Sequence, residues 1–280
     1  MGLAFSKLEA LGNDFVLVDA RSAPWHPAGA WIRQLGDRRR GIGFDQLLVL
    51  EPSPQPRTTR CRVAIYNQDG SSAEQCGNGM RAVACWLARR GELEPGTAVL
   101  TDAGPVELAA SPDQQFSACL PPPSFDAEAV GHTGPTPWER EYASERQQLI
   151  AVSMGNPHLV IFDTIGPASD RLIELGHRYS PPGFWPDGAN VNLARITGRR
   201  SVELAVFERG VGPTPACGSG ACATAAAAIR LGLADAPLTI HQPGGALVID
   251  WHAEARGITM TGPARLVFDG HLNESEDPPA

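Results

Sequence analysis

The apolar residues of this chain gather in short runs that are separated by turns rich in glycine and proline. Runs of this length predict β-strands, and they lie at 62–67, 159–163, 202–208, 246–250 and 264–270. Glycine or proline between neighbouring runs favours hairpins. The pattern therefore predicts an antiparallel sheet more than parallel βαβ units.

Two segments follow the spacing of a helix instead. Apolar side chains recur after Cys76 at helical intervals, at Met80, Val83, Ala84 and Leu87. After Cys217 comes the alanine-rich run 221–233, which is a good helix former with little bulk. We expect this second helix to be buried on all sides. A glycine, Gly91 or Gly232, ends each predicted helix.

The two helical segments belong to an internal repeat. Segment 76–91 matches segment 217–232 at seven of sixteen positions, an offset of 141 residues (217 − 76), and both open with Cys-Gly-x-Gly. Near the start of the chain, Asn13 stands opposite Asn156 at an offset of 143 (156 − 13). Matches in the same order at nearly one offset indicate a duplication. We predict two homologous halves with a boundary near the proline-rich segment 120–125.

Composition narrows the class of protein. The chain is 42% hydrophobic and 19% charged, as globular proteins are. A net charge of −8 argues against nucleic acid and against an anionic membrane as partners. No apolar run is long enough for a membrane span, and the start of the chain lacks the apolar core of a signal peptide. We expect a cytoplasmic protein.

Several cofactor classes lack their usual residues. Of the 23 basic residues only Lys7 is a lysine, and it lies in a predicted strand without a phosphate-binding loop. Pyridoxal phosphate chemistry, which needs a lysine Schiff base, is therefore not expected. The chain has no Cys-x-x-Cys pair and no Cys/His cluster at the spacing of metal ligands. It also lacks the G-x-G-x-x-G dinucleotide motif and the Walker A phosphate-binding loop. We expect no cofactor and no metal.

The six cysteines are expected to be thiols, because nothing suggests an oxidising compartment. Cys76 and Cys217 open the predicted helices, where unpaired N–H groups and the helix dipole favour the thiolate. The glycines beside them leave N–H groups available to an anion. The remaining cysteines are expected to be inert small apolar residues: Cys61, Cys85, Cys119 and Cys222.

Two such thiols on opposite sides of one small anion suit racemisation or epimerisation at the α-carbon of an amino acid. One thiolate takes the α-proton from one face, and the opposite thiol delivers a proton to the other. The N–H groups stabilise the charge that develops on the carboxylate. Two alternatives of another class are a thiol redox protein whose two cysteines form a disulfide, and a non-catalytic amino-acid-binding protein.

Seven motifs along the chain resemble the successive signatures of the diaminopimelate epimerase family, in order. They are LGNDFVLVDAR, GIGFDQLL, YNQDGSSAEQCGNGMRA, SMGNPHLVIF, VFERGVG, ACGSGACAT and MTGPARLVF. The resemblance covers the chain to about residue 270. The chain departs from the family pattern at Glu9-Ala10, at Pro213 and Pro215 before Cys217, and at Phe268, where tyrosine is common.

The resemblance implies a fold. We expect an α/β protein of the α+β type, with two pseudo-twofold-related domains that are each a mostly antiparallel sheet or barrel around a central helix. The N-terminal half-repeat domain, residues 1–118 with 265–280, would carry Cys76. The C-terminal one, residues 119–264, would carry Cys217.

The resemblance also implies site residues. Cys76 and Cys217 would be the paired acid/base thiols. The carboxylate of the reacting end would be held at the two helix starts, by Gly77, Asn78, Gly218 and Ser219. The remaining substrate-binding set would be Asn13, Gln46, Asn67, Asn156, Asn190, Glu208 and Arg209. Arg209 suits a second carboxylate and Glu208 an ammonium group, while His158 and Glu208 would tune the pKa of the thiols.

The implied activity is cofactor-independent interconversion of LL- and meso-2,6-diaminopimelate in lysine and peptidoglycan precursor synthesis, by a cytoplasmic homodimer. An alternative on the same fold is a racemase of proline, hydroxyproline or histidine. Such a substrate lacks a second amino-acid end, so it would have no use for Asn67, Asn190, Glu208 and Arg209 together.

Overall fold

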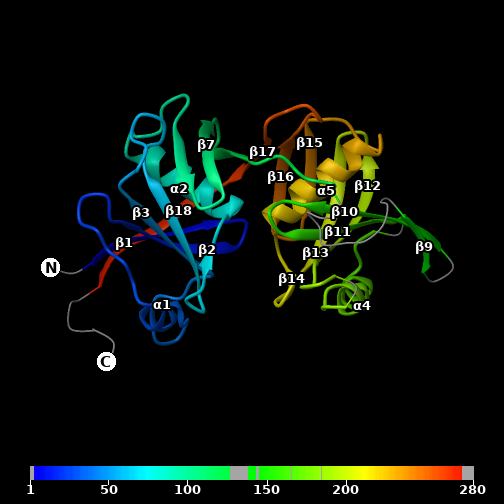
Figure 1. Ribbon diagram of the computed structural model, residues 1–280, viewed down its shortest axis with the longest axis horizontal. Helices are drawn as coiled ribbons and strands as arrows, with labels where there is room; N and C mark the ends of the chain where they lie inside the picture. The colour runs from blue at the N-terminus through cyan, green and yellow to red at the C-terminus, as the bar shows by residue number, and fades with distance from the viewer. Residues whose placement is uncertain (1–2, 127–137, 143–144, 165, 184, 273–280) are drawn as a thin grey trace. The chain divides into compact units, whose positions relative to one another are not determined.

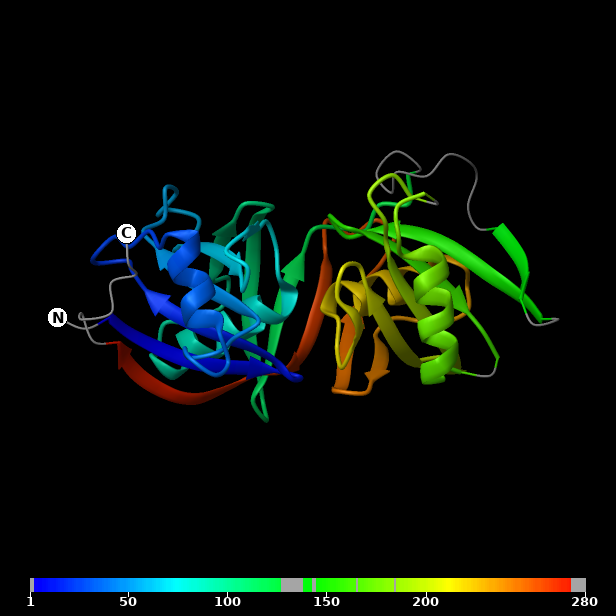
Figure 2. The ribbon, with the colours of Figure 1, turned by 90° about the horizontal axis from the view of Figure 1, so that it is seen from below.

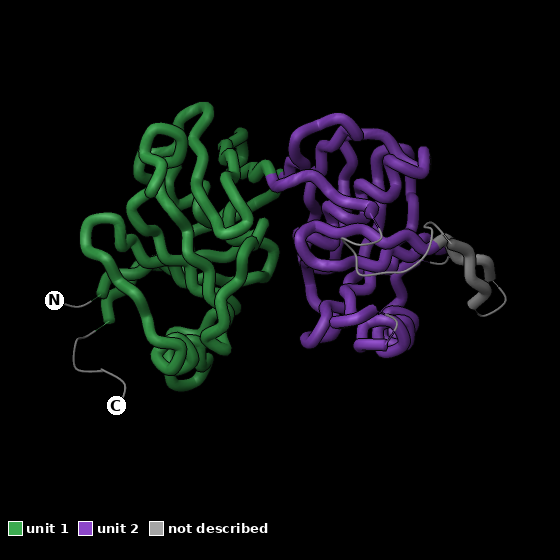
Figure 3. Tube along the Cα trace, viewed as in Figure 1, with its two compact units in different colours: residues 1–119, 261–280 green, residues 120–260 purple. Residues whose placement is uncertain are grey.

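The computed structural model describes residues 3–126, 138–142, 145–164, 166–183 and 185–272. Residues 1–119 with 261–280 form one compact unit, and residues 120–260 form a second (Figure 3). Cys76 lies in the first unit and Cys217 in the second. In the part of the chain that is described, no helix is both long and apolar enough to cross a membrane.

The described part of the first unit consists of short strands and two helices, α1 and α2. Its elements are β1 (Leu3–Ala10), β2 (Asn13–Asp19), α1 (Gly29–Gly36), β3 (Gln46–Glu51), β4 (Arg62–Asn67), β5 (Ser72–Ala73), α2 (Gly77–Arg89), β6 (Ala98–Thr101), β7 (Gly104–Ser111), β8 (Gln115–Leu120) and β18 (Arg265–Leu272).

The second unit repeats this order. Its elements are β9 (Trp138–Tyr142), β10 (Glu145–Ser153), β11 (Pro157–Phe162), α4 (Ser169–Tyr179), β12 (Asn190–Gly198), β13 (Ser201–Glu208), β14 (Gly212–Thr214), α5 (Gly218–Arg230), β15 (Leu238–Gln242), β16 (Gly245–Asp250) and β17 (Ile258–Pro263), whose last residues belong to the first unit.

Strand pairing repeats along with element order. β1–β2, β3–β4, β4–β5 and β6–β7 are antiparallel, as are their counterparts β10–β11, β12–β13, β13–β14 and β15–β16. β2–β3 and β4–β6 are parallel, as are β11–β12 and β13–β15. Mixed sheets with few helices confirm the predicted α+β class.

Each unit holds one helix among its strands (Figure 1). α2 contacts β1, β2, β7 and β18, and α5 contacts β10 to β13, β15 and β16. Every side chain of α5 from Ala221 to Ala228 is fully buried. Alanine lets strands approach the helix backbone closely on several sides, which explains how one helix fits among so many strands. The expectation that this helix is buried all round is confirmed.

Among the described strands, antiparallel pairs are the majority, as expected, but each unit also contains two parallel βαβ crossovers, and one of the two runs through α2 (β4–β6) or α5 (β13–β15). α1 carries the chain between parallel strands β2 and β3, and α4 does so between β11 and β12. Parallel neighbours need such a crossover. The apolar residues of α1 and α4 pack on one face of these strands, while α2 and α5 contact the strands as well. Figure 2 shows α1 in blue and α4 in yellow-green, each over its own unit.

Burial on both faces explains why the sequence of these strands is misleading. β3 is buried without interruption from Leu47 to Leu50, and β11 from His158 to Phe162. Strands covered on both faces are apolar throughout and do not alternate with polar residues. Continuous apolar runs in the sequence therefore indicate the strands of these parallel βαβ crossovers. In α4 the buried residues Leu172, Leu175 and Tyr179 also recur at helical spacing.

Strand order gathers polar residues at one edge of each unit. β2 and β3 are parallel and begin at Asn13 and Gln46, while antiparallel β4 ends at Asn67, which pairs with Gln46. In the second unit His158 of β11 lies opposite Asn190 of β12. Starts of parallel strands and the end of an antiparallel neighbour meet at the same edge.

Candidate active site

Cys76 and Cys217 are the N-cap residues of α2 and α5. Their backbones are extended, with φ −148° and ψ 103° for Cys76, and φ −125° and ψ 113° for Cys217. Each Sγ accepts a hydrogen bond from the third residue of its helix: Gly79 N at 3.3 Å and Gly220 N at 3.4 Å. An N–H donor and the positive end of a helix dipole both stabilise a thiolate. The structure thus places both predicted thiols where they can act as bases.

The third helical position leaves little room for a side chain. A Cβ on Gly79 would lie 3.2 Å from Leu48 and 3.4 Å from Cys76 Sγ. A Cβ on Gly220 would lie 3.0 Å from Val206 and 3.3 Å from Cys217 Sγ. A Cβ at either position would therefore make a tight contact with Leu48 or Val206 and lie directly against the sulfur. The second glycine of each Cys-Gly-x-Gly motif therefore keeps the thiol on its N–H donor.

In the first unit, Asn13 and Asn78 are held by charged residues. Asn78 Nδ2 donates to Asn13 Oδ1 at 3.3 Å. Asn13 Nδ2 in turn donates to Asp45 Oδ2 at 2.7 Å. The fully buried Arg81 donates from Nη2 to Asn78 Oδ1 at 2.6 Å. Two predicted substrate-binding amides are thus fixed from both sides by a carboxylate and a guanidinium.

Gln46 and Asn67 form a second hydrogen-bonded group in the same unit. Gln46 Nε2 donates to Asn67 Oδ1 at 2.9 Å, and Asn67 Nδ2 donates to Ser71 Oγ at 3.0 Å. Gln46 Oε1 is buried and has no hydrogen-bond partner among the described residues. A buried acceptor without a partner is a suitable place for an N–H donor of a ligand.

In the second unit, His158 is buried and neutral. Burial lowers its pKa to about 4, and its Nδ1 lies 3.2 Å from Asn192 Oδ1. The Asn192 amide nitrogen donates to Gly220 O and Thr224 Oγ1, so its oxygen is the acceptor and Nδ1 carries the hydrogen. His158 Nε2 then presents a lone pair toward Asn156, whose Oδ1 lies 3.2 Å away. A hydrogen bond forms there when the Asn156 amide is turned so that its NH₂ group faces the ring. The neutral ring positions Asn156 and supports the first turn of α5.

Asn190 and Arg209 are joined through the backbone. Arg209 N donates to Asn190 Oδ1 at 2.9 Å, and Asn190 Nδ2 donates to Pro157 O at 3.2 Å. Arg209 Nη1 donates to Asp187 O and Gly188 O, at 3.1 and 3.3 Å. Carbonyl oxygens thus orient the guanidinium without neutralising its charge.

Glu208 and Ser219 complete the second group. Glu208 Oε1 accepts from Thr214 Oγ1 at 2.6 Å. Ser219 Oγ lies 3.5 Å from Cys217 Sγ. Hydrogen bonds connect Asn13 to Asn78 at the start of α2, and Asn156 and His158 to the first turn of α5. The remaining predicted site residues are the chain neighbours of the two cysteines (Gly77, Gly218 and Ser219) and three further sets: Gln46 with Asn67, Asn190 with Arg209, and Glu208, which bonds Thr214.

Comparison with known proteins identifies the family. The sequence profile described as diaminopimelate epimerase matches residues 5–119 and 150–267. The chain belongs to the diaminopimelate epimerase family. It is 43% identical to the diaminopimelate epimerase of Rhizorhabdus wittichii, over 98% of this chain and 97% of that protein. It is 42% identical to that of Halorhodospira halophila, over 96% and 95%.

Solved structures of other proteins share the fold. A hydroxyproline epimerase from Agrobacterium vitis, with bound trans-4-hydroxy-L-proline, superposes with a TM-score of 0.67 at 15% identity, covering 99% of this chain and 93% of that one. A phenazine biosynthesis protein of the PhzF family from Bacillus anthracis gives a TM-score of 0.64 at 15% identity, covering 98% and 99%. At these identities the likeness shows the fold alone.

Three residues that position the diaminopimelate epimerase motifs escaped the sequence analysis. Asp45 precedes Gln46 directly, and Arg81 follows Asn78 by one helical turn. Asn192 follows Asn190 by two residues, which puts both on one face of β12. Helical and strand spacing from the predicted residues could have identified all three.

The other cysteines differ from the two at the helix starts. Burial raises the pKa of Cys61 to about 12 and also raises the pKa of Cys85. Cys222 is fully buried within α5. A thiol whose pKa is raised by burial is a poor base at neutral pH, as expected for the inert cysteines.

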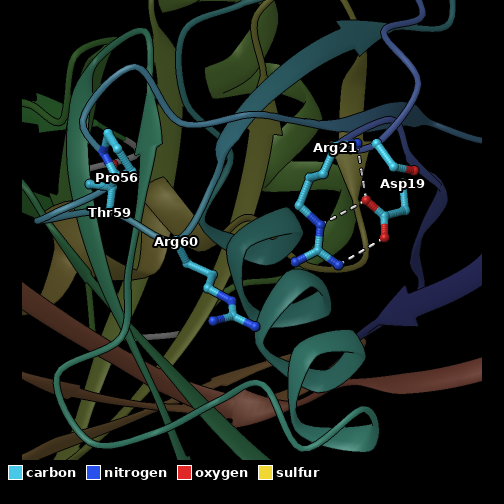
Figure 4. A pocket seen from close by; sticks show the side chains of 6 residues that line it. Asp19, Arg21, Pro56, Thr59 and Arg60 are labelled. Carbon is cyan, nitrogen blue, oxygen red and sulfur yellow. Dashed lines mark hydrogen bonds and ion pairs between the residues drawn. The ribbon is translucent and has the colours of Figure 1, made fainter.

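A hollow of about 420 Å³ lies apart from these groups within the first unit (Figure 4). It is lined by Asp19, Arg21, Ser22, Pro56, Thr59 and Arg60. Its guanidinium groups are already paired, because Arg21 bonds Asp19 and both arginines bond Glu92. It contains no predicted site residue. Within the described ranges, no group of three or more His, Cys, Asp or Glu side chains could hold a metal ion.

Proposed function

We propose that this chain epimerises LL- and meso-2,6-diaminopimelate with Cys76 and Cys217 as its two acid/base thiols. The chain is an isomerase of the diaminopimelate epimerase family. The observation that carries the assignment of the thiols is that each caps a helix and accepts a hydrogen bond from the third residue's N–H. None of the other four cysteines is the N-cap residue of a helix in the part of the chain that the structure describes.

The proposed reaction uses one thiol from each half-repeat domain, residues 1–118 with 265–280 for Cys76 and 119–264 for Cys217. One thiolate removes the α-proton, and its sulfur becomes a thiol. The opposite thiol gives its proton to the other face of the same carbon and becomes the thiolate. Protons and charge therefore balance without another reactant. The first N–H groups of α2 and α5, at Gly77, Asn78, Gly218 and Ser219, hold the carboxylate of the reacting end.

The distal end of the substrate is assigned to the amide groups and the ion-pairing residues. Arg209 is oriented by carbonyl oxygens and keeps its charge for a carboxylate. Glu208 suits the distal ammonium group, and Asn13, Gln46, Asn67, Asn156 and Asn190 can donate to or accept from either group. His158 is assigned to tuning Cys217 through Asn192, because neutral His158 bonds the amide that bonds Gly220.

The test is substrate scope under reducing conditions. The protein is incubated separately with LL-diaminopimelate, L-proline, trans-4-hydroxy-L-proline and L-histidine, and products are separated by chiral chromatography. Meso-diaminopimelate as the sole new isomer is the expected result. Inversion of proline, hydroxyproline or histidine instead would contradict the proposal, and so would the absence of inversion of every substrate.

We also propose that the enzyme is a cytoplasmic homodimer in lysine and peptidoglycan precursor synthesis. Support for self-association comes from β18, which leaves Val267 and Phe268 about half exposed, at 48% and 47%. Exposed apolar neighbours on one strand favour a protein partner. Analytical ultracentrifugation should give a dimer that Val267→Glu weakens. A wild-type monomer at micromolar concentration would contradict the proposal.

A further inference from the structure

Both thiol-bearing residues donate their backbone N–H to a glutamine side chain. Cys76 N donates to Gln75 Oε1 at 3.0 Å, and Cys217 N donates to Gln242 Oε1 at 2.8 Å. Neither glutamine belongs to the substrate-binding set. Gln75 directly precedes its cysteine, whereas Gln242 lies at the end of β15, 25 residues after Cys217.

The geometry of a helix start explains why this N–H needs an acceptor. In a common N-terminal capping arrangement the third helical residue is Glu or Gln, and its side chain reaches back to the N–H of the N-cap residue. Here the third residue is Gly79 or Gly220, where a Cβ would already lie 3.4 or 3.3 Å from the sulfur and a longer side chain has little room. The glycine that admits the thiol therefore removes the usual acceptor for its N–H, and an outside glutamine replaces it.

The two glutamines occupy positions that the repeat does not relate. At the offset of 141 residues that aligns Cys76 with Cys217, the counterpart of Gln75 is Ala216 and that of Gln242 is Thr101. Strand pairing agrees, since Thr101 pairs with Gly104 and Gln242 pairs with Gly245. Thr101 Oγ1 donates to Gly104 O at 2.9 Å. Descent from one ancestral residue therefore does not account for the same bond in both halves.

Packing alone does not explain these glutamines either. Gln242 is 8% exposed, and the Nε2 atoms of both glutamines are buried without a hydrogen-bond partner among the described residues. A buried unbonded NH₂ group costs free energy. An apolar side chain of similar size would fill the space without that cost, so the oxygen is what distinguishes glutamine here.

We propose that Gln75 and Gln242 are positioning residues, one for each thiol base. This inference rests on the proposed function for its catalytic consequence. Each glutamine holds its cysteine in the extended N-cap conformation, which keeps Sγ on the N–H of Gly79 or Gly220. That hydrogen bond stabilises the thiolate, so each glutamine sets the basicity of one thiol and leaves the other unchanged.

The first experiment measures the two thiols separately, without substrate. Gln75→Met and Gln242→Met keep the approximate shape and remove the acceptor. The matched control is Thr101→Val, which removes a buried hydrogen bond at the counterpart of Gln242. Each protein is alkylated with iodoacetamide over a range of pH, and the modified cysteines are quantified by peptide mapping. The pH midpoint reports the thiol pKa independently of its accessibility.

Gln242→Met should raise the midpoint of Cys217 by about half a unit to one unit and leave that of Cys76 in place. Gln75→Met should do the reverse, and Thr101→Val should move neither. Unchanged midpoints in both glutamine variants, or an equal shift of both thiols in either one, would overturn the proposal. If a methionine variant does not fold, the leucine variant at the same position replaces it.

The second experiment measures the consequence for each face of the substrate. Elimination of halide from a 3-halogenated diaminopimelate requires one base only, and the α-configuration decides which thiol acts. Gln242→Met should slow elimination about tenfold for one configuration and spare the other, while Gln75→Met shows the opposite preference. Equal slowing of both would overturn the inference. If the wild type fails to epimerise diaminopimelate, the proposed function fails while the alkylation experiment still decides the role of the glutamines.

Discussion

The first turns of α2 and α5 present a thiol in the same geometry, but the polar residues that hold each helix start in place differ. We call these residues the support of each thiol. Near Cys76 the support is ionic: Arg81 and Asp45 hold Asn78 and Asn13. Further out, Asp14 accepts from Arg38 and from Lys7, and the Lys7 ammonium group also donates to Gly43 O. Burial opposes ionisation of Asp14, yet these cations lower its pKa to about 2.

Near Cys217 the support is neutral and more deeply buried. His158, Asn192 and Thr224 are all fully buried, and they join β11 and β12 to α5 through hydrogen bonds between uncharged groups. The difference shows that the helix-start thiol depends on its own backbone geometry, which both halves keep. The polar groups beneath it can be charged or neutral, provided that each is bonded.

The largest expected effect is the loss of epimerisation when either thiol is removed, which tests whether the two halves serve one reaction. Cys76→Ala and Cys217→Ala should each lower epimerisation by about 10³-fold, since each removes an acid/base group that no other residue replaces. The rate of meso-diaminopimelate formation is the measurement, and Cys119→Ala is the control. If either variant keeps a tenth of the wild-type rate, the halves do not share the reaction as proposed.

Lowering the pH should destabilise the two units at different pH values. The pKa of His158 falls from 6.5 to about 4 on folding, so its neutral form contributes about 3 kcal/mol that is complete above pH 6.5 and lost as pH falls toward 4. The pKa of Asp14 falls from 3.8 to about 2, so its contribution is lost only as pH falls below about 4. The second unit should therefore loosen before the first.

Hydrogen exchange of each unit between pH 7 and 2.5, followed by mass spectrometry, checks this order. His158→Gln keeps hydrogen-bonding groups and removes the titration, so the early loosening of the second unit should disappear in this variant. Simultaneous loosening of both units in the wild type would contradict the assignment of a neutral support to one and an ionic support to the other.

Replacing Arg81, the buried member of the ionic support, should lower stability and activity moderately. Arg81→Met leaves Asn78 Oδ1 and Pro263 O without the hydrogen bonds that Arg81 supplies, and should lower the free energy of unfolding by about 1–3 kcal/mol. kcat/KM should fall about tenfold, because Asn78 and Asn13 lose their orientation. Denaturant unfolding and steady-state kinetics are the measurements.

The control for Arg81 is Arg265→Met, which breaks an ion pair with Glu9. The Arg265 side chain is 66% exposed, so its loss should change stability little. Equal effects of the two substitutions on kcat/KM would remove Arg81 from the support of the site.

The smallest expected effect concerns the outer part of the ionic support. Lys7→Met should lower stability by about 1 kcal/mol, and Arg38→Met by less. Both residues bond Asp14, but the Lys7 side chain is 11% exposed and that of Arg38 is 54% exposed, so solvent screens Arg38 more. Thermal unfolding of the two variants compares them, and a larger loss for Arg38→Met would reverse this ranking.

Local features of the fold and site could be predicted from the sequence. The repeat and the glycines placed Cys76 and Cys217 at helix starts, and Gly91 and Gly232 set the helix ends near Arg89 and Arg230. The α+β class followed from short strands interrupted by turns. These features depend on residues that are neighbours along the chain, where spacing and backbone preference act directly.

Features that depend on distant residues escaped prediction. The crossovers through α1 and α4 were missed because continuous apolar runs, which are typical of strands buried on both faces, were assigned to antiparallel hairpins. Gln242 meets Cys217 across 25 residues through the path of β15, and no spacing rule links them. The charge state of His158 depends on complete burial, which a sequence pattern cannot give for a single residue.

The central claim is that two thiols serve opposite faces of one carbon, and the fate of the α-hydrogen tests it most directly. The reduced enzyme is incubated in D₂O with LL-diaminopimelate, and both isomers are isolated during the first few per cent of conversion. The account predicts one deuterium at the inverted carbon of the meso product and none in the remaining LL substrate. The product's hydrogen would then come from a second thiol equilibrated with solvent. Protium retained at the inverted carbon, or equal deuterium in both isomers, would contradict the account.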